Sequence, residues 1–271
     1  MNLVDGRTIA KDLLVGVRAD IEAAGGRRIV RAIVVRPSPA TESYLLTKAA
    51  RAEDAGMHLE VMKLADDATT EDVIRAIEEP GADSMIVQLP LPDSIDTDRV
   101  LDRIPLEKDA DVLSKAAYAA FKEGKSGALV PPVAGAVARI LEAHGIDPNG
   151  KRAVVVGKGR LVGEPVSVWL TQQGARVTVL TRESEDRSAL KDADIIVSGA
   201  GVANLIRPED IKEGVVLIDA GTSESGGAIV GDADPACADK ASVFTPVPGG
   251  VGPVAVACLF RNAARLARHV A

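Results

Sequence analysis

Short runs of apolar, β-branched residues alternate with helical patterns along this chain, and this alternation limits the possible folds more than any other feature. Residues 29–35 have the sequence IVRAIVV, which predicts a buried strand. Helical patterns flank this run, and each ends at a glycine. In this part we predict strands at 29–35, 58–63 and 84–88 and helices at 8–24, 40–55 and 69–79. A βαβαβ order of this kind predicts a parallel sheet covered by helices.

A second alternating run follows toward the C-terminus. In it we predict strands at 152–156, 176–180, 194–197 and 215–219, and helices at 131–146, 165–173 and 254–270. With 271 residues, the chain is long enough for two domains that each bury a core. The predicted fold class is therefore α/β with two domains, and the helix at 131–146 links them. The pattern alone leaves open which domain the last helix joins.

Composition and charge exclude several classes of partner. Aromatic residues make up 2% of the chain and the net charge is −7, so we expect neither nucleic acid nor an anionic membrane as a partner. The N-terminal residues carry charges throughout and predict an amphipathic helix rather than a signal peptide, so a cytoplasmic protein is expected. Cys237 and Cys258 lack metal-ligand spacing, so we expect two reduced thiols and no metal site.

The segment VVVGKGRLVGEP at 154–165 predicts a dinucleotide site. A predicted strand leads into Gly157-Lys158-Gly159, and a predicted helix follows. Glycine permits the tight turn and lets backbone amides approach a pyrophosphate, while the helix N-terminus favours negative charge. The spacing G-x-G-x-x-x-G is one residue longer than the usual fingerprint. An ordinary strand-to-helix turn is therefore the alternative.

Residues at the end of the next predicted strand indicate which dinucleotide is bound. Arg182 stands where a 2′-phosphate would lie, and Lys158 is on the glycine loop. Two cations at this place favour NADP over NAD. Glu183 argues the other way, because NAD sites place an acidic residue here for the ribose hydroxyls. We therefore expect NADP, with NAD as the less favoured cofactor.

Upstream, Tyr44 and Lys48 are spaced i and i+4, so a helix presents both on one face. A lysine whose pKa is lowered by partial burial can act as a general acid or base. A surface Tyr–Lys pair is the alternative. Short-chain dehydrogenases use the same spacing downstream of their glycine loop, so the order here excludes that class. Gln88 ends a predicted strand, where open α/β sheets bind ligands.

Taken in order, five segments resemble the methylenetetrahydrofolate dehydrogenase/cyclohydrolase family, the bifunctional FolD-type enzymes. They are SYLLTK at 43–48, VQLPLP at 87–92, KDAD at 108–111, GKGRLVGEP at 157–165 and TPVPGGVGP at 245–253. The resemblance implies an N-terminal α/β domain that holds folate and a Rossmann-like domain that holds NADP, with folate in the cleft between them. The implied bounds are 1–128 with 252–271 for the folate domain, to which the C-terminal helix returns, and 129–251 for the NADP domain.

The resemblance also implies roles for individual residues. Lys48 matches the catalytic lysine, Tyr44 the aromatic residue on the folate, Gln88 the residue that orients the lysine, and Asp111 the one that holds the pterin. The implied substrate-binding residues are Tyr44, Val87, Leu89, Asp111, Pro248, Gly249 and Gly250. The implied cofactor-binding residues are Gly157, Lys158, Gly159, Arg160, Leu161, Arg182, Ala200, Gly221 and Thr222.

The activity that the resemblance implies is NADP-dependent oxidation of 5,10-methylenetetrahydrofolate, followed by hydrolysis of the methenyl product to 10-formyltetrahydrofolate. A homodimer joined through the dinucleotide domain is also implied. The sequence departs from the family pattern at Val112 and in the segment up to residue 135, at Gly159 and at Ala255. These departures leave a monofunctional dehydrogenase or a noncatalytic folate- or nucleotide-binding protein as alternatives. A shikimate-type dehydrogenase would not explain TPVPGGVGP.

Overall fold

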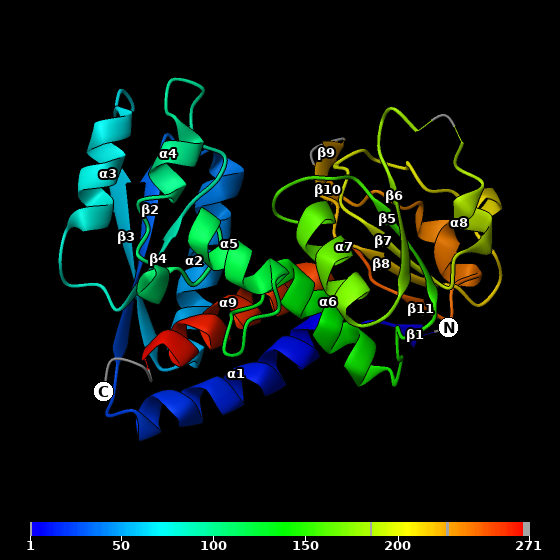
Figure 1. Cartoon of the computed structure of the whole chain (residues 1–271), viewed down its shortest axis with the longest axis horizontal. Coiled ribbons are helices and arrows are strands. Elements are labelled where there is room, and N and C mark those ends of the chain that lie inside the picture. Colours follow the sequence, from blue (N-terminus) through cyan, green and yellow to red (C-terminus); the bar gives the residue numbers. More distant parts are fainter. Residues whose placement is uncertain (1, 185, 226–227, 268–271) are drawn as a thin grey trace. The chain divides into compact units, whose positions relative to one another are not determined.

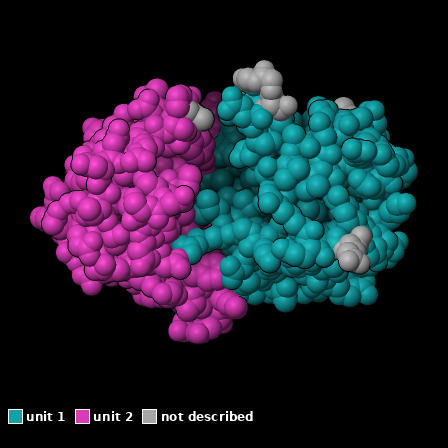
Figure 2. All heavy atoms as spheres, turned by 90° about the horizontal axis from the view of Figure 1, so that it is seen from above, with its two compact units in different colours: residues 1–10, 133–255 teal, residues 11–132, 256–271 magenta. Residues whose placement is uncertain are grey.

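The protein is described here by a computed structural model that covers residues 2–184, 186–225 and 228–267. The chain separates into two compact units. Unit 1 comprises residues 1–10 and 133–255, and unit 2 comprises residues 11–132 and 256–271 (teal and magenta in Figure 2). Each unit has its own parallel sheet (Figure 1), so the predicted α/β fold is confirmed. The predicted linker helix is α6, Pro132–Ala143, and nearly all of it belongs to unit 1.

Unit 2 is built on a three-stranded parallel sheet in the order β3-β2-β4. Its strands are β2 Arg28–Val35, β3 Met57–Leu64 and β4 Ser84–Val87, close to the predicted bounds. The central strand β2 is buried from Val30 onward, which explains its nearly continuous apolar sequence. Arg31 is buried within it, and its guanidinium donates to the Glu60 carboxylate and to the carbonyls of Glu79 and Pro80. These acceptors satisfy a charge that would otherwise be costly to bury.

Helices cover this sheet and complete the core of unit 2. They are α2 Pro39–Asp54, α3 Thr70–Glu78, α4 Thr97–Leu101 and α5 Lys115–Lys122, together with the short 3₁₀ helix Leu106–Lys108. The long helices α1 Gly6–Ala23 and α9 Val251–Ala267 contribute residues to both units. On α9, the amide of Asn262 donates to the carbonyls of Ala110 and Val130, which attaches the C-terminal helix to unit 2. Residues 268–270 of the predicted last helix lie outside the described residues.

Unit 1 contains a six-stranded parallel sheet in the order β1-β11-β8-β7-β5-β6. Its strands are β1 Asn2–Leu3, β5 Arg152–Val156, β6 Arg176–Leu180, β7 Ile195–Ser198, β8 Val216–Asp219 and β11 Val243–Phe244. Helix α7, Gly163–Gln172, packs against β5 and β6, and the short α8, Ala189–Asp192, contacts β5. An antiparallel pair, β9 Ser223–Ser225 and β10 Ala228–Val230, follows β8, and 3₁₀ turns lie at Pro208–Asp210 and Pro235–Asp239.

The strand order of unit 1 reverses at β5. The chain leaves β5 for β6 on one side and then crosses to β7 on the other. Loops that follow β5 and β7 therefore diverge at the carboxyl edge of the sheet. In open parallel sheets such a reversal is where ligands bind. The predicted glycine loop follows β5 and lies at this point.

The structure also contains elements that the sequence analysis did not predict. The strands β1 and β11 have two residues each, too few to show a period of two in the sequence. Helix α1 begins at Gly6 rather than at Thr8, because the Asp5 carboxylate accepts the backbone N–H groups of Arg7 and Thr8. Helices α4 and α5 were not predicted, because they are too short to show a clear helical period. Helix α5 begins after Ser114, whose side chain caps it.

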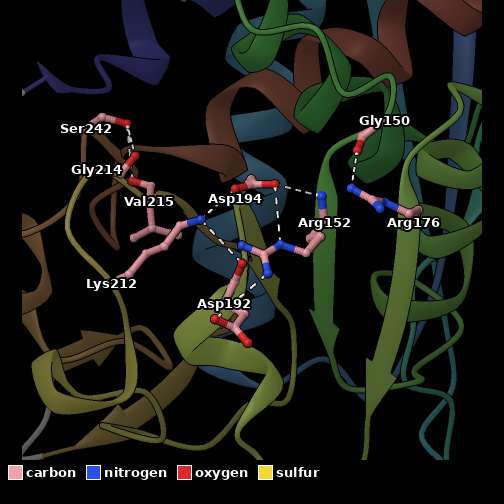
Figure 3. Close-up of polar contacts among 9 residues, drawn as sticks. All are labelled: Gly150, Arg152, Arg176, Asp192, Asp194, Lys212, Gly214, Val215 and Ser242. Atoms are coloured by element: carbon pink, nitrogen blue, oxygen red, sulfur yellow. Dashed lines mark hydrogen bonds and ion pairs between the residues drawn. The ribbon is translucent and has the colours of Figure 1, made fainter.

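At the amino edge of the unit 1 sheet, polar contacts join the starts of neighbouring strands (Figure 3). The Asp194 carboxylate, just before β7, accepts the backbone N–H of Arg152 at 2.9 Å and the Lys212 ammonium at 2.5 Å. Asp192 lies close by, but its carboxylate is 3.8 Å from the Arg152 guanidinium and its side chain is 76% exposed. Asp194 therefore connects β5, β7 and the segment before β8. The Asp192 side chain makes a weak surface ion pair, and its backbone carbonyl accepts the Lys212 ammonium at 3.3 Å.

This difference predicts unequal effects on stability. Asp194→Asn should lower the free energy of unfolding by about 1–2 kcal/mol, because two hydrogen bonds to a charged group are weakened and the site is only partly exposed. Asp192→Asn, its matched control, should change the free energy of unfolding by less than about 0.5 kcal/mol. Urea titrations at neutral pH measure both. Equal values for the two variants would contradict the assignment.

Candidate active site

The central contact of unit 2 joins Lys48 of α2 to Gln88, which follows β4. Lys48 is 7% exposed, and its Nζ donates to Oε1 of Gln88 at 2.9 Å. The Gln88 amide Nε2 in turn donates to the carbonyl of Leu89 at 2.9 Å. That second bond fixes which end of the amide faces the lysine. The predicted pairing of lysine and glutamine therefore exists as a hydrogen bond between two elements that are 40 residues apart.

Tyr44 lies on the same face of α2, as its spacing predicts. The Lys48 ammonium nitrogen is 4.9 Å from the centroid of the Tyr44 ring, within the range of a cation–π contact. Tyr44 is 39% exposed, so part of its surface is available to a ligand. Burial, followed by the charge of Asp111, raises the pKa of Tyr44 to about 12. Both causes act in the same direction, and the phenol is protonated at neutral pH.

Asp111 reaches this group from a tight loop beside β4. Residue Asp109 of the loop forms a parallel bridge with Met85 of β4. The buried Asp109 carboxylate accepts the backbone N–H groups of Leu113 at 3.2 Å and of Ser114 at 2.8 Å. Asp111 lies inside the turn that these bonds close. Its charge acts on both Tyr44 and Lys48, so the loop completes a set of four polar side chains.

Burial shifts the pKa values of Lys48 and Asp111 in opposite directions. Burial lowers the pKa of Lys48, while the charge of Asp111 opposes that shift. Burial raises the pKa of Asp111 to about 6; the Lys48 ammonium lowers it, and the Asp109 carboxylate raises it further. Burial thus moves the pKa of Lys48 down and that of Asp111 up, toward each other, which makes proton transfer at this site easier. Paired shifts of this kind are typical of general acid–base sites.

The expected substrate-binding residues fall in both units. Val87 has its side chain in the core of unit 2, so any contribution to a ligand would come from its backbone. Leu89 is half-buried beside Gln88. Pro248, Gly249 and Gly250 belong to unit 1, where the Gly249 carbonyl accepts the N–H of Gly6 at 3.1 Å. A β-carbon on Gly6 would lie 1.8 Å from the carbonyl oxygen of Gly250, so the N-terminal segment packs tightly on this loop.

The glycine loop of unit 1 depends on two close backbone approaches. Gly157 has φ +102°, and a β-carbon there would lie 2.9 Å from the carbonyl oxygen of Gly199. A β-carbon on Gly163 would lie 2.1 Å from the carbonyl oxygen of Gly157. Only glycine allows helix α7 to start this close to the end of β5. No side chain caps α7, whose N-cap is Val162. In its first turn Pro165 has no N–H and the Glu164 N–H donates to the Gly159 carbonyl at 3.1 Å, so the N–H of Gly163 is the one that can reach an anion.

Charged residues of the expected cofactor site surround this loop. The four residues from Lys158 to Leu161, Arg160 among them, are exposed, as is Arg182 beyond β6. The Gly157 N–H donates to the Leu180 carbonyl at 2.8 Å, which brings the ends of β5 and β6 together. The Lys158 ammonium lies 3.7 Å from the Glu183 carboxylate. The predicted cations thus lie at two adjacent strand ends, with an acidic side chain on one of them.

Two buried carboxylates, Asp219 and Asp232, lie near Ala200, Gly221 and Thr222 and were not among the predicted site residues. Asp232 follows β10 and accepts three hydrogen bonds from the end of β7 and its loop. Asp219 ends β8, and its carboxylate accepts the N–H groups of Gly221 and Ala233. Asp219 could have been noticed, because it is a polar residue at the end of an apolar strand. Nothing in the local sequence distinguishes Asp232 from an exposed turn residue.

These residues fit a dinucleotide on grounds of backbone geometry and charge. The loop offers an uncapped helix N-terminus, a positive-φ glycine and exposed cations at the adjoining strand ends. In the described part of the chain, no group of His, Cys, Asp and Glu is arranged to hold a metal ion. None of the described helices is long and apolar enough to span a membrane.

Comparison with known proteins assigns the chain to a family. Residues 4–111 match the catalytic domain of tetrahydrofolate dehydrogenase/cyclohydrolase, and residues 131–271 match its NAD(P)-binding domain. The bifunctional protein FolD of Lactobacillus delbrueckii subsp. bulgaricus is 35% identical over 276 residues, which covers 98% of this chain and 97% of the relative.

Solved structures agree over the full length. The bifunctional enzyme FolD from Campylobacter jejuni has a TM-score of 0.96 and 32% identity, with 100% of both chains covered. The Trypanosoma brucei enzyme, complexed with NADP cofactor and inhibitor, has a TM-score of 0.92 and 32% identity, covering 99% of this chain and 97% of the other. The resemblance seen in the five sequence segments is confirmed, and this chain belongs to the tetrahydrofolate dehydrogenase/cyclohydrolase family.

Proposed function

We propose that this protein oxidises 5,10-methylenetetrahydrofolate to the methenyl form with NADP and hydrolyses that product to 10-formyltetrahydrofolate. The observation that carries the proposal is the buried Lys48 ammonium, hydrogen-bonded to Gln88 and under the charge of Asp111. A lysine is rarely buried unless it is paired, and buried lysines with a shifted pKa are concentrated at functional sites. In a member of this family, that lysine is the group best placed for proton transfer on the folate.

In the hydrolytic step, Lys48 would act as the base. Water adds to the cationic methenyl carbon of the substrate, and its proton passes to the neutral amine of Lys48. The hydroxyl of the adduct then loses its proton to solvent and becomes the formyl C=O, while the bond from that carbon to N5 breaks and N5 takes up the proton held by Lys48. This leaves the formyl group on N10 and Lys48 neutral again. Burial favours the neutral amine that the first transfer requires, and the hydrogen bond that Nζ donates to Gln88 holds Nζ in position. Asp111 would hold the pterin, and Tyr44 would pack on or bond the folate.

For the oxidation step, unit 1 would hold the nucleotide. NADP, when bound, supplies the acceptor for the hydride that the folate loses. The amides of Gly159 and of Gly163, at the start of α7, would contact the pyrophosphate, and Gly157 would let the phosphates approach the backbone closely. Arg182 and Lys158 would contact the 2′-phosphate. Arg160, Leu161, Ala200, Gly221 and Thr222 remain the other expected contacts.

The proposal is tested with purified protein, methylenetetrahydrofolate and NADP in a spectrophotometric assay for methenyl formation. Hydrolysis is followed separately by adding the methenyl compound without nucleotide. Turnover in both assays is expected. Folded protein that shows neither activity would refute the proposal, and oxidation without hydrolysis would identify a monofunctional dehydrogenase.

Replacing the proposed base gives the sharpest test of the site. Lys48→Met should reduce cyclohydrolase turnover at least about 100-fold, because general base catalysis contributes about 10²–10⁴ in rate. Lys63→Met is the matched control, since Lys63 is 56% exposed and pairs with Glu42 on the surface. It should retain turnover within about twofold. Full activity of Lys48→Met would remove Lys48 from the proposed role.

Cofactor preference should depend on the residues after β6. Arg182→Ala should raise the KM for NADP about tenfold or more and change the KM for NAD less than about twofold, because a charge-assisted bond to the 2′-phosphate is lost. Glu183→Gln should lower the KM for NADP, since the carboxylate near Lys158 is removed. Steady-state kinetics with each nucleotide measure both variants. An equal change with NADP and NAD would show that Arg182 does not contact the 2′-phosphate.

The raised pKa of Asp111 predicts how folate use depends on pH. The pKa of Asp111 is about 6, so the carboxylate is ionised above that pH and can accept N–H groups of the pterin. As the pH falls through about 6 it gains a proton, and kcat/KM for the folate should decrease by up to tenfold per pH unit. Asp111→Asn should have a lower kcat/KM without this inflection. A wild-type profile that is flat between pH 5 and 7, about one unit either side of that pKa, would contradict the assignment.

We also propose that the protein is a homodimer joined through unit 1. The edge strand β6 supports this arrangement, because one side of its backbone is not paired within the sheet and Val179 is 40% exposed. A cytoplasmic location, where thiols such as the buried Cys237 and Cys258 stay reduced, is part of the same proposal. The product would supply one-carbon units for purine synthesis.

A further inference from the structure

A buried carboxylate in unit 1 supports the loop after β7. Asp232 is 0% exposed. Its Oδ2 accepts the Ser198 hydroxyl at 2.6 Å and the Ala200 N–H at 2.7 Å, and its Oδ1 accepts the Val202 N–H at 2.8 Å. Three donors from a span of five residues therefore converge on one side chain that is 30 or more residues away in sequence.

The loop that Asp232 supports lies against the glycine loop. The carbonyl oxygen of Gly199 would be 2.9 Å from a β-carbon on Gly157, and a β-carbon on Gly199 would meet the side chain of Val162 at 2.2 Å. A shift of the segment after β7 would therefore move a wall of the expected nucleotide site. Ala200, expected to contact the cofactor, donates its own N–H to Asp232. The carboxylate thus acts one residue away from that contact.

Close neighbours also confine the Asp232 carboxylate. A β-carbon on Gly221, in the loop after β8, would lie 2.1 Å from the Asp232 carboxyl carbon. On the other side of the same loop, Asp219 accepts the N–H of Gly221 at 2.9 Å and the N–H of Ala233 at 2.8 Å. The backbone of Asp232 is also fixed, since its carbonyl accepts the Ile206 N–H at 3.1 Å. The loops after β7 and β8 are held together around this one side chain.

We propose that Asp232 is a positioning residue for nucleotide binding, which fixes the segment 199–202 beside the glycine loop through three converging hydrogen bonds. The inference rests on the proposed use of NADP. Asp232 does not touch the reacting atoms; it acts through the backbone of Ala200 and Val202. Its loss should therefore affect binding of the nucleotide more than the chemical step.

Asp232→Asn provides the test, because it keeps the size of the side chain and places an amide NH₂ where a donor must be accepted. The dissociation constant for NADP, measured by calorimetry on the full-length protein, should rise at least about tenfold. The KM for NADP should rise in parallel, while kcat at saturating NADP falls less than about threefold. Asp234→Asn is the matched control, since Asp234 lies two residues away and caps only the local turn at Ala236. It should bind NADP like the wild type.

Ser198→Ala is the second variant, chosen because it removes one donor to the same carboxylate and no charge. It should weaken NADP binding about threefold and speed hydrogen exchange of the Ala200 and Val202 amides. NADP affinity within twofold of the wild type in every folded variant at these two positions would overturn the proposal. A wild-type protein that neither binds NADP nor turns it over would instead refute the proposed function, so the two failures are distinguishable.

Discussion

The cost of taking charge out of water governs how both units of this protein are built. Lys48, Asp109, Asp219 and Asp232 are all buried. Asp109 is compensated by amides of its own turn, whereas the other three bind groups from other segments of the chain. Most of these contacts lie at the carboxyl edges of parallel strands, where the ladder of backbone hydrogen bonds ends and loops supply free donors and acceptors. Buried charges can therefore lie at the edges of the sheets. Arg31, in the middle of β2, is an exception.

The two units use this edge in different ways. In unit 2, the compensation of Lys48 is partial: one amide oxygen accepts its bond, and burial still lowers its pKa. In unit 1, Asp232 receives three donors, and its position is over-determined. An incompletely compensated charge is available to exchange protons, whereas a fully compensated one is a rigid support. The proton chemistry of unit 2 and the rigid support in unit 1 thus both follow from the cost of burying a charge, which is only partly compensated at Lys48 and fully compensated at Asp232.

Sequence patterns predicted those parts of the structure that depend on neighbours in the chain. The run at 29–35 and the i, i+4 spacing of Tyr44 and Lys48 are local, and the structure shows the strand and the shared helix face. The bond from Lys48 to Gln88 is suggested by the place of Gln88 at the end of a predicted strand and by the family resemblance, but not by the local pattern around Lys48. The role of Asp232 could not be predicted from its sequence neighbours, because its three hydrogen-bond donors come from a segment 30 or more residues away. Two-residue strands such as β11 are likewise fixed only by their neighbours in the sheet.

Val112 shows how a departure from the family pattern can be accommodated by its surroundings. It follows Asp111 and has φ +60°, a conformation that costs a β-branched residue about 1–3 kcal/mol. The bonds from the amides of Leu113 and Ser114 to Asp109 close the turn on its far side. The Val112 side chain is fully buried, and burying a valine contributes about 1.5–3 kcal/mol. Burial therefore offsets the backbone strain, and the loop can present Asp111 to Lys48 although a β-branched residue occupies this left-handed position.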